Sequence, residues 1–107
     1  MHEILKQIRH LVSRGEIRIS EHGYEELAQD GLLATEVVDG LPDATVVEAY
    51  PDYQKGPCVL VLQYDTNGRP IHALWGIPAG AEHPAVLVTA YRPDPERWTD
   101  DFMRRRS

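Results

Sequence analysis

Hydrophobic positions in the first part of the chain recur three or four residues apart. The apolar side chains that follow this spacing are Ile4, Leu5, Ile8, Leu11 and Val12. Such spacing places them in one stripe along a helix, so it predicts a helix over about residues 2–14. Gly15 is typical of the residue at which a helix of this kind ends.

Two shorter helices are predicted after a short alternating segment at residues 17–20. Ser20 is a preferred N-cap residue, and the acidic side chain of Glu21 is favoured by the dipole of the helix that it begins. We therefore expect a helix over about residues 21–29. The pattern predicts a further short helix over about residues 34–40.

The second half of the chain changes to the pattern of strands. Asn67-Gly68 is a strong signal for a two-residue hairpin turn, and an apolar run lies on either side of it. Runs rich in β-branched and other apolar residues predict strands at about residues 45–50, 58–62, 71–77 and 86–91.

The order of these elements predicts the fold class. N-terminal helices over about residues 2–41 come first, followed by a sheet over about residues 44–92. Pro95 is suited to the first turn of a closing helix over about residues 95–105. We expect a single α+β domain over residues 1–107, with the helices packed on one face of a roughly four-stranded antiparallel meander.

His72 is unusual because it lies within an apolar strand. A two-residue loop at Asn67-Gly68 places Gln63 opposite His72, which puts both on the less apolar face with Val59, Val61 and Leu74. The more apolar face should then meet the helices. The members of that face are Cys58, Leu60, Leu62, Tyr64, Ile71, Ala73, Trp75 and Ile77.

The pairing of the next two strands depends on a connection rich in proline and glycine. If Ile77 lies opposite Val86, then His72 lies opposite Tyr91. A slip of one residue would bring Ala90 or Arg92 opposite His72 instead. We therefore state the pairing of His72 with Tyr91 as a hypothesis.

Composition limits the classes of function. The net charge of −6 argues against a broadly basic nucleic-acid-binding domain, and positive charge is local. Cys58 is the only cysteine, which excludes an intramolecular disulfide and a cysteine-rich zinc site and fits a reducing cytoplasm. The histidines lack metal-ligand spacing, so we expect no metal and no cofactor. No apolar run is long enough to span a membrane, and the charged first residues do not resemble a signal peptide.

Four side chains are candidates for chemistry. His22 falls in the first turn of a predicted helix, where the dipole favours the neutral imidazole that a general base requires; it could equally be a surface histidine. His72 is either a hydrogen-bonded structural residue or part of a site. Tyr91 could donate a proton, and Arg92 could bind a phosphate or pair with an acidic neighbour, Asp94 or Glu96.

Three short motifs together resemble a bacterial family. They are Ser20-Glu21-His22-Gly23, Gly68-Arg69-Pro70-Ile71-His72 and Val88-Thr89-Ala90-Tyr91-Arg92-Pro93. In this order they resemble the domain of unknown function 4258 family, over about residues 14–105. The resemblance implies a fold of the RelE/MqsR-like toxin class and a metal-independent endoribonuclease. It also implies an antitoxin-like partner, of the zinc-finger type. Its motif positions are His22, His72, Tyr91 and Arg92.

Two functions follow as hypotheses. In the first, His22 or His72 deprotonates a ribose 2′-hydroxyl, the other histidine or Tyr91 protonates the leaving oxygen, and Arg92 stabilises the transition state. RNA would be bound by further cations, namely Lys55, Arg97 and Arg104. In the second, the domain is a non-catalytic module that binds a protein partner or forms a homodimer through an edge strand.

Overall fold

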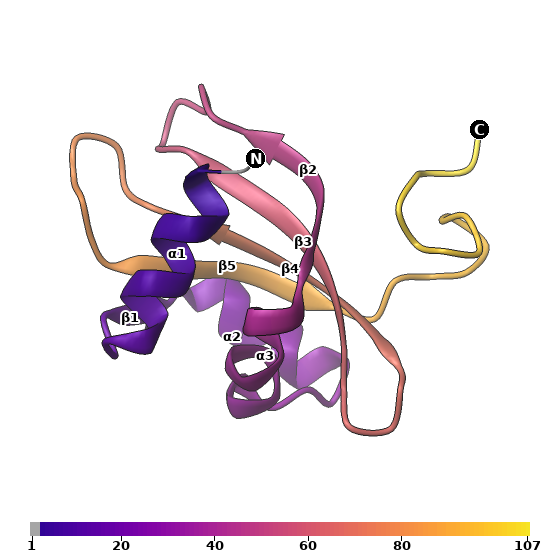
Figure 1. Ribbon diagram of the computed structural model, residues 1–107. Helices are drawn as coiled ribbons and strands as arrows, with labels where there is room; N and C mark the ends of the chain where they lie inside the picture. Colours follow the sequence, from indigo (N-terminus) through magenta and orange to yellow (C-terminus); the bar gives the residue numbers. More distant parts are fainter. Residues whose placement is uncertain (1–2) are drawn as a thin grey trace.

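Five strands form one mixed sheet in the order β1-β5-β4-β3-β2. The computed structural model describes residues 3–107, and Figure 1 shows the helices and the sheet. The strands are β1 (Ile17–Ile19), β2 (Thr45–Tyr50), β3 (Cys58–Tyr64), β4 (Pro70–Gly76) and β5 (Ala85–Tyr91). The α+β class is confirmed.

The three predicted N-terminal helices are present as α1 (Glu3–Ser13), α2 (Glu21–Gln29) and α3 (Ala34–Gly40). A 3-10 turn, η1 (Leu41–Asp43), follows α3. The predicted start of the first helix at about residue 2 lies outside the described residues. All three helices bury apolar residues in one core cluster with alternate residues of β3 and β4 and with Ala85, Leu87 and Ala90 of β5.

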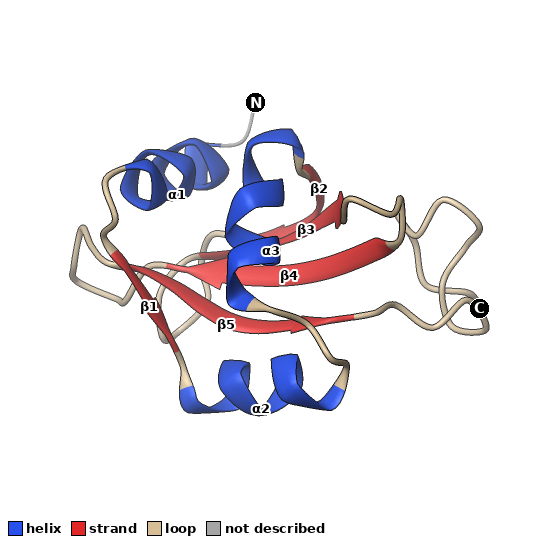
Figure 2. Cartoon of the chain, turned by 90° about the horizontal axis from the view of Figure 1, so that it is seen from below, coloured by secondary structure: helices blue, strands red, loops and turns tan. Residues whose placement is uncertain are grey.

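Ser20 joins α2 to the sheet. Its hydroxyl oxygen accepts a hydrogen bond from the backbone N–H of Gly23 at 2.9 Å, and the hydroxyl donates to the carbonyl of Val88 at 2.9 Å. A Cβ at Gly23 would lie 2.8 Å from the carbonyl oxygen of Leu87, so only glycine allows this close approach. As a result α2 runs beside β5, as Figure 2 shows.

The sheet has one strand more than predicted, and it is not a pure meander. β1 pairs in parallel with the first part of β5, from Ile17 opposite Ala85 to Ile19 opposite Leu87. A strand of three residues carries too few positions for a clear periodic signal, and its partner lies far along the chain. The four-stranded antiparallel prediction is therefore corrected to a five-stranded mixed sheet.

The predicted register of the central hairpin is wrong by one residue. The turn has three residues, 66–68, because Asp65 pairs with Arg69 and its carboxylate accepts from the N–H groups of Asn67 (2.8 Å) and Arg69 (2.9 Å). Gly68 takes a left-handed conformation, with φ 75°. His72 consequently lies opposite Leu62 rather than opposite Gln63.

This register exchanges the two predicted faces of β3. Gln63 lies on the helix side, where its Nε2 donates to the carbonyl of Val37 at 2.9 Å. His72 lies on the opposite face, which we call the open face, together with Leu74. Side chains from β3 that share the open face are Cys58, Leu60 and Leu62, whereas Val59 and Val61 join the core beneath the helices.

The predicted pairing of His72 with Tyr91 is confirmed, although the register at the start of β5 differs from the predicted one. Gly76, not Ile77, lies opposite Val86. A β-bulge at Val88 then adds one residue to β5 and restores the predicted pairing. The bulge also interrupts the alternation of side chains along β5, because such an extra residue re-aims the strand beyond it.

The C-terminal segment is not a helix, so the predicted helix over residues 95–105 is wrong. The backbone N–H groups of Arg97 and Trp98 both bond the carbonyl of Asp94, which makes one turn. The chain then reverses around Asp101, whose carboxylate accepts from Thr99 and Met103. We call residues 93–107 the strap; Figure 1 shows it looping beyond the end of β5.

No helix among residues 3–107 is long and apolar enough to cross a membrane.

Candidate functional site

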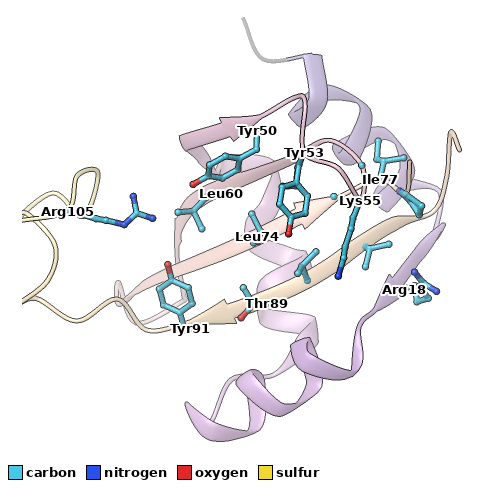
Figure 3. A pocket seen from close by; sticks show the side chains of 16 residues that line it. Arg18, Tyr50, Tyr53, Lys55, Leu60, Leu74, Ile77, Thr89, Tyr91 and Arg105 are labelled. Atoms are coloured by element: carbon cyan, nitrogen blue, oxygen red, sulfur yellow. The ribbon is translucent and has the colours of Figure 1, made fainter. Parts of the chain in front are cut away.

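The open face of the sheet holds a pocket of about 540 Å³. Its floor is apolar, with side chains from β3, β4 and β5 that include Leu60, Leu74 and Val86. The loop after β2 and the strap form its sides. Figure 3 shows two tyrosines on the β2 side, two polar residues of β5 on the opposite side, and a cation at each end. A concave surface of this size is typical of a ligand site.

The charge of this pocket is opposite to that of the chain. Arg18, Lys55 and Arg105 line it, and no carboxylate does so among the described residues, whereas the chain as a whole carries −6. Arg18 comes from β1, Lys55 from the loop after β2, and Arg105 from the strap. The pocket therefore suits an anionic ligand with apolar parts.

Three tyrosines supply the aromatic surface of the pocket: Tyr50, Tyr53 and Tyr91. Tyr53 is 56% exposed although it is large and apolar. Figure 3 shows the rings of Tyr50 and Tyr53 facing Tyr91 and Thr89 across the floor. Exposed aromatic rings beside cations are the arrangement on which unstacked bases of single-stranded nucleic acids bind.

Arg105 is held at its end of the pocket by two contacts. Its guanidinium forms an ion pair with Glu48 of β2 and lies 4.8 Å from the centre of the Trp98 ring. Hydrogen bonds from Arg105 and from the hydroxyl of Tyr50 lower the pKa of Glu48, so this carboxylate stays ionised. Burial, followed by the bond to Glu48, raises the pKa of Tyr50.

His72 is fully buried, with an exposed fraction of 0%. Its Nε2 lies 2.8 Å from the carbonyl oxygen of Phe102, and its Nδ1 lies 3.2 Å from the hydroxyl of Tyr91. The Trp98 ring packs edge-on against the imidazole, with 4.4 Å between ring centres. Burial lowers the pKa of His72, and Arg105 lowers it further. Both ring nitrogens are therefore used inside the protein.

Arg92 is committed to structural contacts. Its Nη2 donates to the Asp65 carboxylate at 2.7 Å, and its Nη1 donates to the carbonyl of Pro70 at 3.2 Å. Its backbone N–H donates to Asp30 at 2.8 Å. These contacts join the end of β5 to the β3–β4 turn and to the end of α2. The partner of Arg92 is thus Asp65, and not the neighbouring Asp94 or Glu96.

His22 lies away from the pocket. It belongs to α2, its side chain is 62% exposed, and its Nε2 lies 3.5 Å from the carboxylate of Glu26 one turn later. Of the four candidates for catalysis, the structure brings together His72 and Tyr91, with Arg92 next in sequence. Only Tyr91 lines the pocket.

The three cations expected to bind RNA occupy different places. Lys55 lines the pocket of the open face. Arg97 lies beside a second, more polar hollow of about 700 Å³ between the strap and the end of β5. Arg104 is exposed on the strap and lines neither hollow. Tyr91 and Arg105 line both hollows.

Several residues of the pocket carry no clear signal in the sequence. Tyr50 is the last residue of β2, Arg18 is the central residue of the short β1, and Arg105 lies in a segment predicted to be helical. Thr89 reaches the open face only because of the bulge at Val88, and its hydroxyl has no hydrogen-bond partner within residues 3–107. The run of arginines at the C-terminus is the one feature that could have indicated Arg105.

Within residues 3–107, no three His, Cys, Asp or Glu side chains are grouped as a metal site requires. Cys58 is buried beneath the pocket, and burial raises the pKa of its thiol.

The fold and the pocket define an α+β domain with a cationic, tyrosine-lined face on its sheet. The family model described as "Domain of unknown function (DUF4258)" matches residues 19–92, and the chain belongs to this family. Comparison with curated proteins and with solved structures finds no match. The matched residues include most of the sheet and end before the strap.

Proposed function

We propose that the protein binds single-stranded RNA in the pocket of the open face. The observation that carries the proposal is the gathering of Arg18, Lys55 and Arg105 around three tyrosine rings, one of them exposed, in a chain that is acidic overall. Phosphates bind guanidinium and ammonium groups, and unstacked bases bind aromatic rings. An acidic peptide would match the cations, but its carboxylates would offer no base to stack on the tyrosine rings at the sides of the pocket.

A direct test is the binding of a short, unstructured, fluorescently labelled RNA, measured by anisotropy at low salt. We expect saturable binding by the wild type and a loss of about tenfold or more for Lys55→Glu, because a contact to a charged group is lost. The dependence of log affinity on log salt should become shallower by about one unit for the lost phosphate contact.

Lys6→Glu is the matched control. It makes the same change of charge at an exposed position of α1, whose buried side faces the core and not the pocket. We expect this variant to bind RNA nearly as the wild type does. Absence of saturable binding by the wild type, or equal losses in Lys6→Glu and Lys55→Glu, would contradict the proposal.

Cleavage of the bound RNA is a separate proposal. It rests on the resemblance to the domain of unknown function 4258 family, which implies a RelE/MqsR-like toxin. The positions of His22, exposed on α2, and of His72, buried with both nitrogens bonded, give no support to a histidine acid/base pair in one cleft. The proposal is tested by incubating RNA with the protein in excess chelator, which removes contaminating metal-dependent nucleases. Cleavage at this face would be supported if the wild type makes RNA fragments and the variants Tyr91→Phe and Arg105→Ala do not. If the RNA is bound but stays intact, the cleavage proposal fails and the RNA-binding proposal stands.

An antitoxin-like partner is compatible with the same face. Such a protein would cover the apolar floor of the pocket and compete with RNA for it. Binding of a protein partner without any binding of RNA would favour the interaction module over the RNA-binding proposal.

A further inference from the structure

The orientation of one hydroxyl group in the pocket follows from the hydrogen bonds of His72. A carbonyl oxygen can only accept, so the contact from Nε2 to Phe102 at 2.8 Å places the proton of the neutral imidazole on Nε2. Nδ1 then carries no proton and can only accept. The hydroxyl of Tyr91, 3.2 Å away, must therefore be the donor of that hydrogen bond.

This arrangement determines what Tyr91 presents to a ligand. Because its proton is directed at His72, the phenolic oxygen offers only lone pairs on its remaining side. Tyr91 lines the pocket of the open face, and Figure 3 shows its hydroxyl directed toward the end of the pocket where Arg105 lies. A hydrogen-bond acceptor and the guanidinium of Arg105 are thus neighbours at this end, where Glu48 pairs with Nη1 of that guanidinium.

A ribonucleotide matches this pair of groups. Its phosphate is an anion suited to a guanidinium, and its 2′-hydroxyl is a hydrogen-bond donor that a deoxyribonucleotide lacks. We propose that Tyr91, held as an acceptor by His72, receives a hydrogen bond from the ribose 2′-hydroxyl and so selects RNA over DNA. The inference rests on the proposed RNA binding and names the group of the substrate that is recognised. His72 is then a positioning residue, which acts through Tyr91.

The test compares three oligonucleotides of one unstructured sequence: RNA, DNA and 2′-O-methyl RNA. The methylated sugar keeps the oxygen and an RNA-like sugar conformation but cannot donate a hydrogen bond. We expect the wild type to bind RNA about fivefold more tightly than either analogue, which is the typical contribution of one hydrogen bond between neutral groups. This comparison requires no variant and no assumption about folding.

Tyr91→Phe keeps the ring and removes the acceptor. We expect it to bind all three oligonucleotides with the affinity that the wild type has for DNA. Tyr64→Phe is the matched control, because Tyr64 is 51% exposed and does not line the pocket; it should keep the preference of the wild type for RNA. His72→Gln, whose amide nitrogen can donate to Phe102 as Nε2 does but which loses the ring acceptor Nδ1, should lower this preference without abolishing binding.

The outcomes separate the inference from the proposed function. If the wild type binds no RNA, the proposed function fails. If it binds RNA, DNA and 2′-O-methyl RNA equally, RNA binding stands and recognition of the 2′-hydroxyl is excluded. Preference for RNA that persists in Tyr91→Phe would also overturn the inference, since another group would then read the sugar.

Discussion

The surroundings of His72 favour its neutral form. Its two nitrogens bond the carbonyl of Phe102 and the hydroxyl of Tyr91, and the Trp98 ring excludes water from it. Burial penalises the charged imidazole and lowers the pKa of His72. The residue that is most unusual in the sequence therefore acts first as a neutral connector between the sheet and the strap.

This environment predicts how stability depends on pH. In the unfolded chain a histidine binds its proton at about pH 6.5, whereas the pKa of His72 in the folded protein lies lower. At pH values between these two pKa values, the unfolded state binds more protons than the folded state does. The stabilising contribution is therefore complete above about pH 6.5 and is lost as the pH falls toward the folded pKa.

The measurement is the free energy of unfolding by denaturant between about pH 7.5 and pH 5. The wild type should lose stability over this range, and His72→Gln, which cannot titrate there, should lose less. His22→Gln, at an exposed histidine, serves as the control and should follow the wild type. Parallel curves for the wild type and His72→Gln would show that His72 does not titrate as described.

At the scale of elements, the strap is attached to the sheet by a few specific contacts. Trp98 is 6% exposed and packs on His72, while Arg105 pairs with Glu48. Trp98 is not a member of the main core cluster beneath the helices. The strap thus forms a small second contact region on the open face, outside the residues that match the family.

Removal of the Trp98 side chain should therefore loosen the strap selectively. We expect Trp98→Ala to destabilise the docked strap by about 3–5 kcal/mol, as is typical for truncating a buried large aromatic residue, with a smaller effect on the unfolding of the helices and the sheet. Trp98→Phe should cost much less. Hydrogen exchange should rise most at residues 97–106, because the hydrogen bonds that close the strap depend on its docking. A uniform rise across α1 and the sheet would contradict separate docking of the strap.

Elements with strong local signals could be predicted from the sequence, and those set by distant contacts could not. The helices and the main strands follow from periodicity and from the cap at Ser20. The β3–β4 register depends on the side chain of Asp65, which widens the turn, and the pairing of His72 with Tyr91 depends on the bulge at Val88. The strap does not form the predicted helix because Trp98 packs on the sheet and the chain turns at Asp101. Neither contact produces a periodic pattern in the sequence.

At the scale of the whole molecule, the two faces of the sheet have different roles. One face meets the helices in a continuous apolar core. The other is partly covered by the strap and otherwise forms the pocket, where cations gather in an acidic chain. Few of the predicted site residues lie in the candidate site: of these, Tyr91 and Lys55 line the pocket. The other charged and aromatic residues of the pocket were not predicted, namely Arg18, Tyr50, Tyr53 and Arg105.

The measurement that tests this account most directly is a titration of the ¹⁵N-labelled protein with an unstructured RNA, followed by the backbone amide signals. We predict that the signals that shift first belong to the open face and its rim, namely residues 50–56, 74–78 and 86–91 and the strap around Arg105. Signals of α1 should stay nearly unchanged. Shifts confined to α2 around His22, or no shifts at saturating RNA and low salt, would contradict the assignment of the open face as the RNA-binding site.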